Sequence, residues 1–311
     1  MMLVQEAVQG HAPAEAPERF NAGTTIIEHI SNPKDHPIVH LPHVFGIDMS
    51  VTKHVFMLWF VAAIVFVIST WVVRRYLKQD RPIPSGFMNA LEAVVVFVRD
   101  DIVQPNVGRR WVKTWTPLIL TFFLFILCAN GIGLIPFFEL LGVADHWVLR
   151  TGEASVIKRL IHGGPTATAN FNVTAALATV TFGAIIVAGS RAHGFVQHWK
   201  NLAPQGLAWP LYFILIPIEI IGMFVRPFAL TMRLAANMTG GHIAILAILS
   251  FVFLFAELFH RAIAGVGIGL AVSVPLAVAI SALEIIVVLV QAYVFTLLSA
   301  VFIGMAIHVH H

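Results

Sequence analysis

Residues 207–256 read LAWPLYFILIPIEIIGMFVRPFALTMRLAANMTGGHIAILAILSFVFLFA, and the length of this apolar stretch decides the fold. Its 50 residues would form a helix about 75 Å long. A helix that crosses the roughly 30 Å hydrocarbon core of a bilayer needs only about 20 residues. The segment must therefore tilt steeply, bend, or lie partly along the membrane. Bending points are offered by Pro217, Pro227 and the pair Gly240 and Gly241.

A second long apolar segment, residues 263–306, follows a short polar turn marked by Glu257, His260 and Arg261. Its 44 residues would form a helix of about 66 Å, again about twice what a bilayer requires. Membrane helices tilt by about 20° on average, so a tilt that absorbs this excess must be imposed by packing against a partner. We expect the two segments to form one antiparallel hairpin, long and steeply tilted.

The composition excludes a water-soluble protein. Only 11% of the 311 residues are charged and 58% are apolar, whereas soluble domains carry about 25% charged residues. The net charge of +3 comes from Lys and Arg scattered among Asp and Glu, which argues against nucleic acid as a partner. The single cysteine, Cys128, rules out a disulfide within the chain and a multi-thiolate metal site.

Three shorter apolar runs each have about the length that crosses a bilayer once. They are residues 55–73, 115–136 and 167–189. With the long hairpin they give five membrane helices, so we expect an all-α integral membrane protein. Residues 53–311 form its membrane domain, residues 1–52 a solvated leader, and residues 139–164 a polar loop.

One further helix is predicted to lie flat at the membrane surface, over residues 86–106. Apolar Leu91, Val94 and Val98 recur there at helical spacing, while charged residues occupy the other positions. This pattern is typical of an interfacial amphipathic helix.

An odd number of spans places the two termini on opposite sides of the membrane. With the N-terminus outside, the inner loops hold ten of the 19 Lys and Arg residues and the outer segments hold seven. Cytoplasmic loops carry the excess of Lys and Arg. We therefore expect the N-terminus outside and the C-terminus inside.

Polar side chains recur within the two long segments, where each is costly in lipid and must face protein or water. They are Glu219, Arg226, Arg233, Asn237, His242, Glu284 and Gln291. In an antiparallel hairpin, facing residues have a constant sum of residue numbers. Arg233 with Gln291 gives 524 and His242 with Glu284 gives 526, and half of 524 falls at the polar turn. The spacing therefore predicts that Arg233 lies beside Gln291 and His242 beside Glu284.

This arrangement suits a proton path. His and Glu side chains exchange protons, whereas Arg stays protonated and cannot relay. Arg233 would thus divide an outer path through His242 and Glu284 from an inner path through Glu219. The alternative is that the polar residues are ion pairs that join helices, such as Glu219 with Arg226, which lies seven residues further along the same helical face.

Four stretches carry a resemblance to the a subunit of F-type ATP synthases. The strongest are RPFALTMRLAANMTGGH over residues 226–242 and LEIIVVLVQAYVFTLLS over residues 283–299. PSGFMNALEAVVVFVRDDI from Pro84 and TPLILTFFLFILCANGIGLIP from Thr116 add support, and the similarity runs from Lys53 to the C-terminus.

The resemblance implies a stator subunit in the Fo sector that offers two offset proton half-channels to a rotating ring of c subunits. Its partners would be that c-ring, the b subunits of the peripheral stalk, the lipid bilayer and, indirectly, the F1 sector. The family's essential arginine resembles Arg233, and its asparagine and glutamine resemble Asn237 and Gln291. His242 and Glu284 resemble the family's histidine on the first tilted helix and its glutamate on the second, and Glu219 resembles the acid of the exit path.

The same resemblance implies a bacterial inner membrane location, with a periplasmic N-terminus and a cytoplasmic C-terminus. No Gly-rich phosphate loop occurs, so nucleotide chemistry belongs to a partner and no cofactor or metal is implied. A self-contained ion-coupled transporter is the alternative, although no repeat relates the two halves. A haem or quinone oxidoreductase subunit would need paired deep histidines, and only His242 is deep.

The predicted sidedness can be tested by cysteine labelling. Gly10→Cys and Val309→Cys, each in a Cys128→Ser background, should react with a membrane-impermeant reagent from opposite sides, because five spans separate them. Intact cells and inverted vesicles provide the two sides. Labelling of both positions from one side would contradict the count of spans.

Overall fold

The structure is a computed structural model that describes residues 42, 50–78, 86–135, 167–200, 209–258 and 262–308. Most of the expected leader, the expected loop at 139–164, and the turn residues His260 and Arg261 lie outside the described residues. Within those ranges the chain is helical and contains no β-strand.

Five of the described helices are long and apolar enough to cross a membrane, which confirms an all-α membrane fold. They are α2 (Lys53–Leu77), α5 (Val112–Leu134), α8 (Phe171–His193), α10 (Trp209–Leu258) and α11 (Ala262–Ile307). The shorter elements are α3 (Phe87–Val96), the π-helix η1 (Phe97–Val103), α4 (Gln104–Val107), the 3₁₀ helix η3 (Ala167–Ala169) and α9 (Phe195–Lys200).

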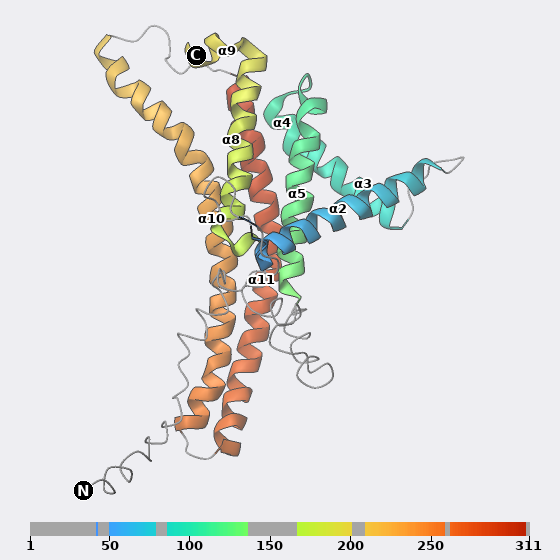
Figure 1. Cartoon of the computed structure of the whole chain (residues 1–311), viewed down its shortest axis with the longest axis vertical. Helices are drawn as coiled ribbons and strands as arrows, with labels where there is room; N and C mark the ends of the chain where they lie inside the picture. The colour runs from blue at the N-terminus through green and yellow to red at the C-terminus, as the bar shows by residue number, and fades with distance from the viewer. Residues whose placement is uncertain are drawn as a thin grey trace, which may run out of the picture.

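The two longest helices form the predicted hairpin. α10 has 50 residues and α11 has 46, and both run without a break through their internal prolines, Pro217, Pro227 and Pro275. They lie side by side and extend beyond α5 and α8 toward the hairpin turn, while the first turns of α10 lean away from the bundle (Figure 1). Near the turn, Gly269 lets α11 approach the backbone of Val252 in α10.

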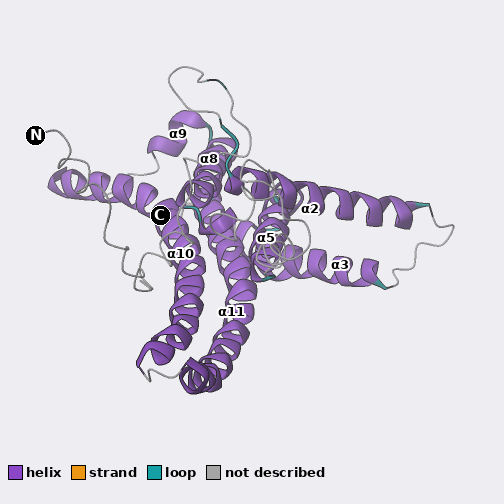
Figure 2. Ribbon diagram, turned by 60° about the horizontal axis from the view of Figure 1, so that its bottom comes forward, coloured by secondary structure: helices purple, strands orange, loops and turns teal. Residues whose placement is uncertain are grey.

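The helix α2 differs in direction from the rest of the bundle. It runs crosswise to the common direction of α5, α8 and α11, and α3 projects on the same side of the bundle (Figures 1 and 2). The 25 residues of α2 measure about 37 Å, a length that matches a bilayer with little tilt. The 46-residue helix α11, by contrast, is about twice as long as a bilayer requires.

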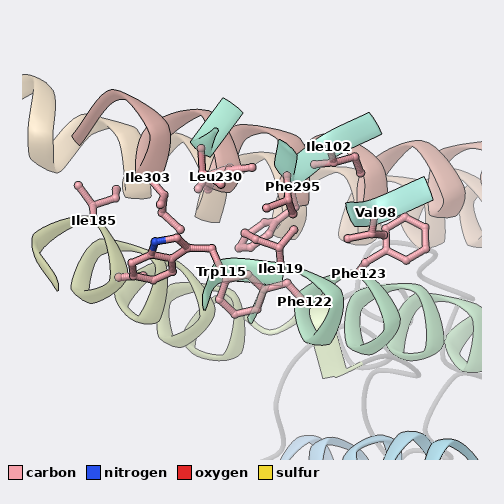
Figure 3. Close-up of a cluster of buried hydrophobic side chains, with 14 of the residues drawn as sticks. Val98, Ile102, Trp115, Ile119, Phe122, Phe123, Ile185, Leu230, Phe295 and Ile303 are labelled. Atoms are coloured by element: carbon pink, nitrogen blue, oxygen red, sulfur yellow. The ribbon is translucent and has the colours of Figure 1, made fainter. Parts of the chain in front are cut away.

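The core lies where α5, α8, α10, α11 and η1 meet. Trp115, Ile119 and Phe122 of α5 are at most 5% exposed, and Phe122 meets Phe295 of α11 edge to face at 5.6 Å. Figure 3 shows these side chains converging with Leu230 of α10. Without a hydrophobic drive between helices in lipid, such close van der Waals packing holds the bundle together.

The expected interfacial helix is confirmed as amphipathic, over α3, η1 and α4. Val98, Ile102 and Val103 are fully buried against α5 and α11, whereas Glu92 and Asp101 are exposed. The sequence did not predict that residues 97–103 form a π-helix, whose wider turn changes which side chains share a face.

The C-terminal end of α11 is held by two neighbouring elements, α8 and α4. His193 of α8 donates from Nε2 to the carbonyl oxygen of Ile307 at 2.9 Å, and His308 donates from Nε2 to that of Val107 at 3.2 Å. Both bonds satisfy carbonyl groups at helix ends. Gly304 packs directly on the backbone of Asn106, and a Cβ there would collide with the Asn106 carbonyl.

We expect Gly304→Ala to destabilise the chain by about 1–3 kcal/mol, because the added methyl group overpacks the contact with α4. Gly267→Ala in the same helix is the matched control, since nothing lies within 4 Å of its Cβ position. The measurement is thermal unfolding of the detergent-solubilised chain, followed by reaction of the Cys128 thiol with a fluorogenic dye. Equal midpoints for the two variants would contradict the packing argument.

Candidate functional site

The structure brings His242 and Glu284 together across the hairpin. His242 Nδ1 lies 3.7 Å from Glu284 Oε1, and the two side chains are 13% and 4% exposed. The pairing agrees with the sum of residue numbers. Two titratable groups this close, largely shielded from the surroundings, need only a small movement to reach hydrogen-bond distance and pass a proton between them.

Gly241 makes room for this pair. A Cβ at position 241 would lie 2.6 Å from Glu284 Oε1, so any side chain would displace the carboxylate. From the sequence alone, the glycines beside His242 suggest bends, whereas α10 continues through them as helix. In the sequence, the signal for this close approach across the hairpin is a glycine next to a histidine within an apolar helix.

Gln291 is held by Asn237 rather than by Arg233. Asn237 donates from Nδ2 to Gln291 Oε1 at 2.9 Å, and Gln291 is 4% exposed. The sum of residue numbers predicts Arg233 beside Gln291. The contact lies four residues, or one helical turn, further along α10, which keeps the same helical face and changes only the register.

Arg233 is a cation without an ion-pair partner among the described residues. Its side chain is exposed, and it forms no hydrogen bond or ion pair with any residue that the structure describes. It lies on α10 one turn before Asn237 and about 14 Å along the helix from His242. Its five N–H donors are therefore available to water or to a partner.

Glu219 forms an ion pair on the other side of Arg233. Arg226 Nη2 donates to Glu219 Oε1 at 3.3 Å, and the guanidinium of Arg226 lies 5.9 Å from the ring centre of Phe302 in α11. Arg226 with Phe302 and Asn237 with Gln291 both sum to 528, so these two contacts share one register. At that register Glu219 lies level with the C-terminal end of α11.

A polar contact that sequence reasoning missed joins η3 to its neighbours. Thr168 Oγ1 donates to Asn130 Oδ1 of α5 at 2.6 Å, and Thr239 Oγ1 of α10 donates to the Ala169 carbonyl oxygen at 3.3 Å. Thr168 and Asn130 are at most 1% exposed. An asparagine within an apolar span was the available signal, because such a residue needs a partner.

The polar side chains of the hairpin thus fall into three sets. They are the His242–Glu284 pair, Arg233 beside the Asn237–Gln291 hydrogen bond, and the Arg226–Glu219 ion pair. Within the described ranges no three His, Cys, Asp or Glu residues gather as a metal site would require. Such a series can carry protons or another small cation along the hairpin.

Comparison with known proteins gives a single family. A family model described as ATP synthase A chain matches residues 55–304. The chain is 40% identical to ATP synthase subunit a 2 of Chlorobium luteolum over 305 residues, which is 95% of this chain and 79% of that protein. It is 39% identical to ATP synthase subunit a 2 of Prosthecochloris aestuarii, covering 97% and 85% of the two chains, and 38% identical to ATP synthase subunit a of Chlorobium phaeobacteroides, covering 97% and 79%.

Proposed function

The chain belongs to the ATP synthase A chain family, and from this premise we propose that it provides two offset proton half-channels to a rotating c-ring, separated by Arg233. The observation that carries this proposal is an exposed cation, free of described partners, between a His–Glu pair and an Arg–Glu pair on one hairpin. An apolar helix surface with one unpaired guanidinium is complementary in charge to an apolar partner helix that carries one carboxylate.

The outer half-channel ends at His242 and Glu284. Their 3.7 Å separation and their burial support a relay in which a proton that enters from the periplasm passes from one side chain to the other. Gly241 leaves space for the Glu284 carboxylate. From this pair the proton moves to a carboxylate on the ring.

Arg233 separates the two half-channels because a guanidinium cannot give up its proton. It stabilises the ionised form of a ring carboxylate that passes it, which obliges the carboxylate to release its proton on one side and to take one up on the other. One turn away from Arg233, the hydrogen bond from Asn237 to Gln291 joins α10 to α11 and fixes the Gln291 side chain.

The inner half-channel uses Glu219. It lies about 21 Å along α10 from Arg233 and level with the end of α11, where protons reach the cytoplasm. The offset between Glu284 and Glu219 along an oblique hairpin means that a proton crosses only after the ring has turned.

The proposed partners follow from the same role. They are the c-ring, the b subunits of the peripheral stalk, the lipid bilayer and, indirectly, the F1 sector, in a bacterial inner membrane with a periplasmic N-terminus and a cytoplasmic C-terminus. The chain itself would bind no nucleotide, and the complex would couple the proton flow to ATP synthesis.

We expect Arg233→Ala to abolish ATP-driven proton pumping and ATP synthesis while the complex still assembles, because Arg233 is exposed and holds no described neighbour in place. Arg233→Lys should also fail, since lysine lacks the planar fork and can lose its proton. Arg110→Ala, which removes an exposed arginine outside the hairpin, is the control. The measurements are pumping and synthesis in inverted vesicles.

Normal coupled synthesis by the Arg233→Ala complex would contradict the assignment. Solute transport by the purified chain alone in liposomes would favour the self-contained transporter instead.

His242 and Glu284 should behave as one unit in transport. His242→Ala and Glu284→Ala should each slow pumping, and the double variant should lose less than the two effects combined, because residues in contact couple. The measurement is a double-mutant cycle of pumping rates in inverted vesicles. Fully additive effects would mean that the two side chains act on separate steps.

A further inference from the structure

Arg226 joins the two helices of the hairpin at the level of Glu219. On α10 it reaches back seven residues, about 10.5 Å along the helix, to the Glu219 carboxylate. On the other side its guanidinium lies over the Phe302 ring of α11 at 5.9 Å, within the range of a cation–π contact. Met223, 7% exposed, lies between Glu219 and Arg226 on the same helical face.

This ion pair is a poor candidate for a structural brace. Both partners belong to one helix, so the Glu219–Arg226 bond does not join two elements. Their side chains are 42% and 30% exposed, and ion pairs with such access to water contribute little to stability. The contact between helices is made by Arg226 and Phe302. The ion pair therefore fixes the position of the Glu219 carboxylate and contributes little to holding the two helices together.

We propose that Arg226 is a positioning residue for the inner half-channel: anchored on Phe302, it holds the Glu219 carboxylate at the end of α11. This inference rests on the proposed function, in which Glu219 serves that half-channel. The structure assigns Phe302 as the anchor, because its ring lies beside Arg226 at the common register of the hairpin.

Arg226 binds and releases the Glu219 carboxylate once for each proton that passes. An ionised Glu219 accepts the charge-assisted bond from Arg226, whereas a protonated Glu219 loses most of that attraction. A proton that arrives forms an O–H bond on the carboxylate and frees it from Arg226. When that O–H bond breaks and the proton passes to water on the cytoplasmic side, the carboxylate returns to Arg226 and to its starting position.

The test is passive proton flux through the membrane sector in vesicles after removal of the F1 sector, expressed per assembled complex. We expect Arg226→Gln to slow the flux by about two- to fivefold, the range that corresponds to a partly exposed ion pair. Arg226→Lys should restore part of the rate because it keeps the charge. Phe302→Leu should slow the flux less than Arg226→Gln, since it removes the anchor and leaves the ion pair.

The double variant separates positioning from a general effect. Glu219→Gln should slow the flux, and adding Arg226→Gln to it should slow the flux no further, because there is no longer a carboxylate to position. Arg110→Gln is the matched control: Arg110 also lies over a ring, Trp111 at 5.5 Å, and has no carboxylate partner among the described residues. It should leave the flux unchanged.

Three results would overturn the inference. The first is an Arg226→Gln complex that assembles poorly but conducts normally per complex, which indicates a structural role. The second is an equal slowing by Arg226→Gln with and without Glu219→Gln. The third is an unchanged flux in Glu219→Gln, which removes Glu219 from the path and the inference with it, while the Arg233 variants still test the main proposal separately.

Discussion

The mismatch between helix length and bilayer thickness is the constraint on which the rest of this structure depends. A hydrocarbon core of about 30 Å admits α-helices because their backbone groups are satisfied internally, but it does not admit helices of 50 and 46 residues in an upright position. The two helices must cross it obliquely, and only contact with other helices holds them there. The buried cluster of α5, α8 and η1 on one side of the hairpin supplies part of that contact. The exposed apolar side chains along the rest of α10 and α11 must be covered by lipid or a partner.

An oblique hairpin converts distance along the chain into sideways displacement in the membrane. Glu219 and His242 are 23 residues apart on α10, about 34 Å along the helix axis. In an upright helix this separation would place them at opposite membrane faces on one line. In an oblique helix they also differ in lateral position, so a path to one need not meet a path to the other. The proposed offset of the two half-channels thus follows geometrically from the same length that decides the fold.

Much of this arrangement could be predicted from the sequence, because helix length and the cost of polar groups in lipid are both local properties. The hairpin and the facing of His242 and Glu284 followed from them. The contact of Gln291 with Asn237 instead of Arg233 did not, because residue sums fix the register only to within about one turn. The π-helix of η1 and the close packing of Gly304 on Asn106 arise from contacts between distant segments, which no local pattern contains.

The exposed position of Arg233 also bears on what the chain needs around it. A charged side chain near the middle of a membrane helix costs at least about 2.5–3.5 kcal/mol, and it is retained where it meets water or an opposite charge. His242 lies beside Glu284 and Arg226 beside Glu219, so each of these residues has a titratable or charged neighbour within the chain. Arg233 has no such neighbour among the described residues. Of the charged side chains that the structure describes on the hairpin, Arg233 is therefore the one whose charge a passing carboxylate on a partner would balance.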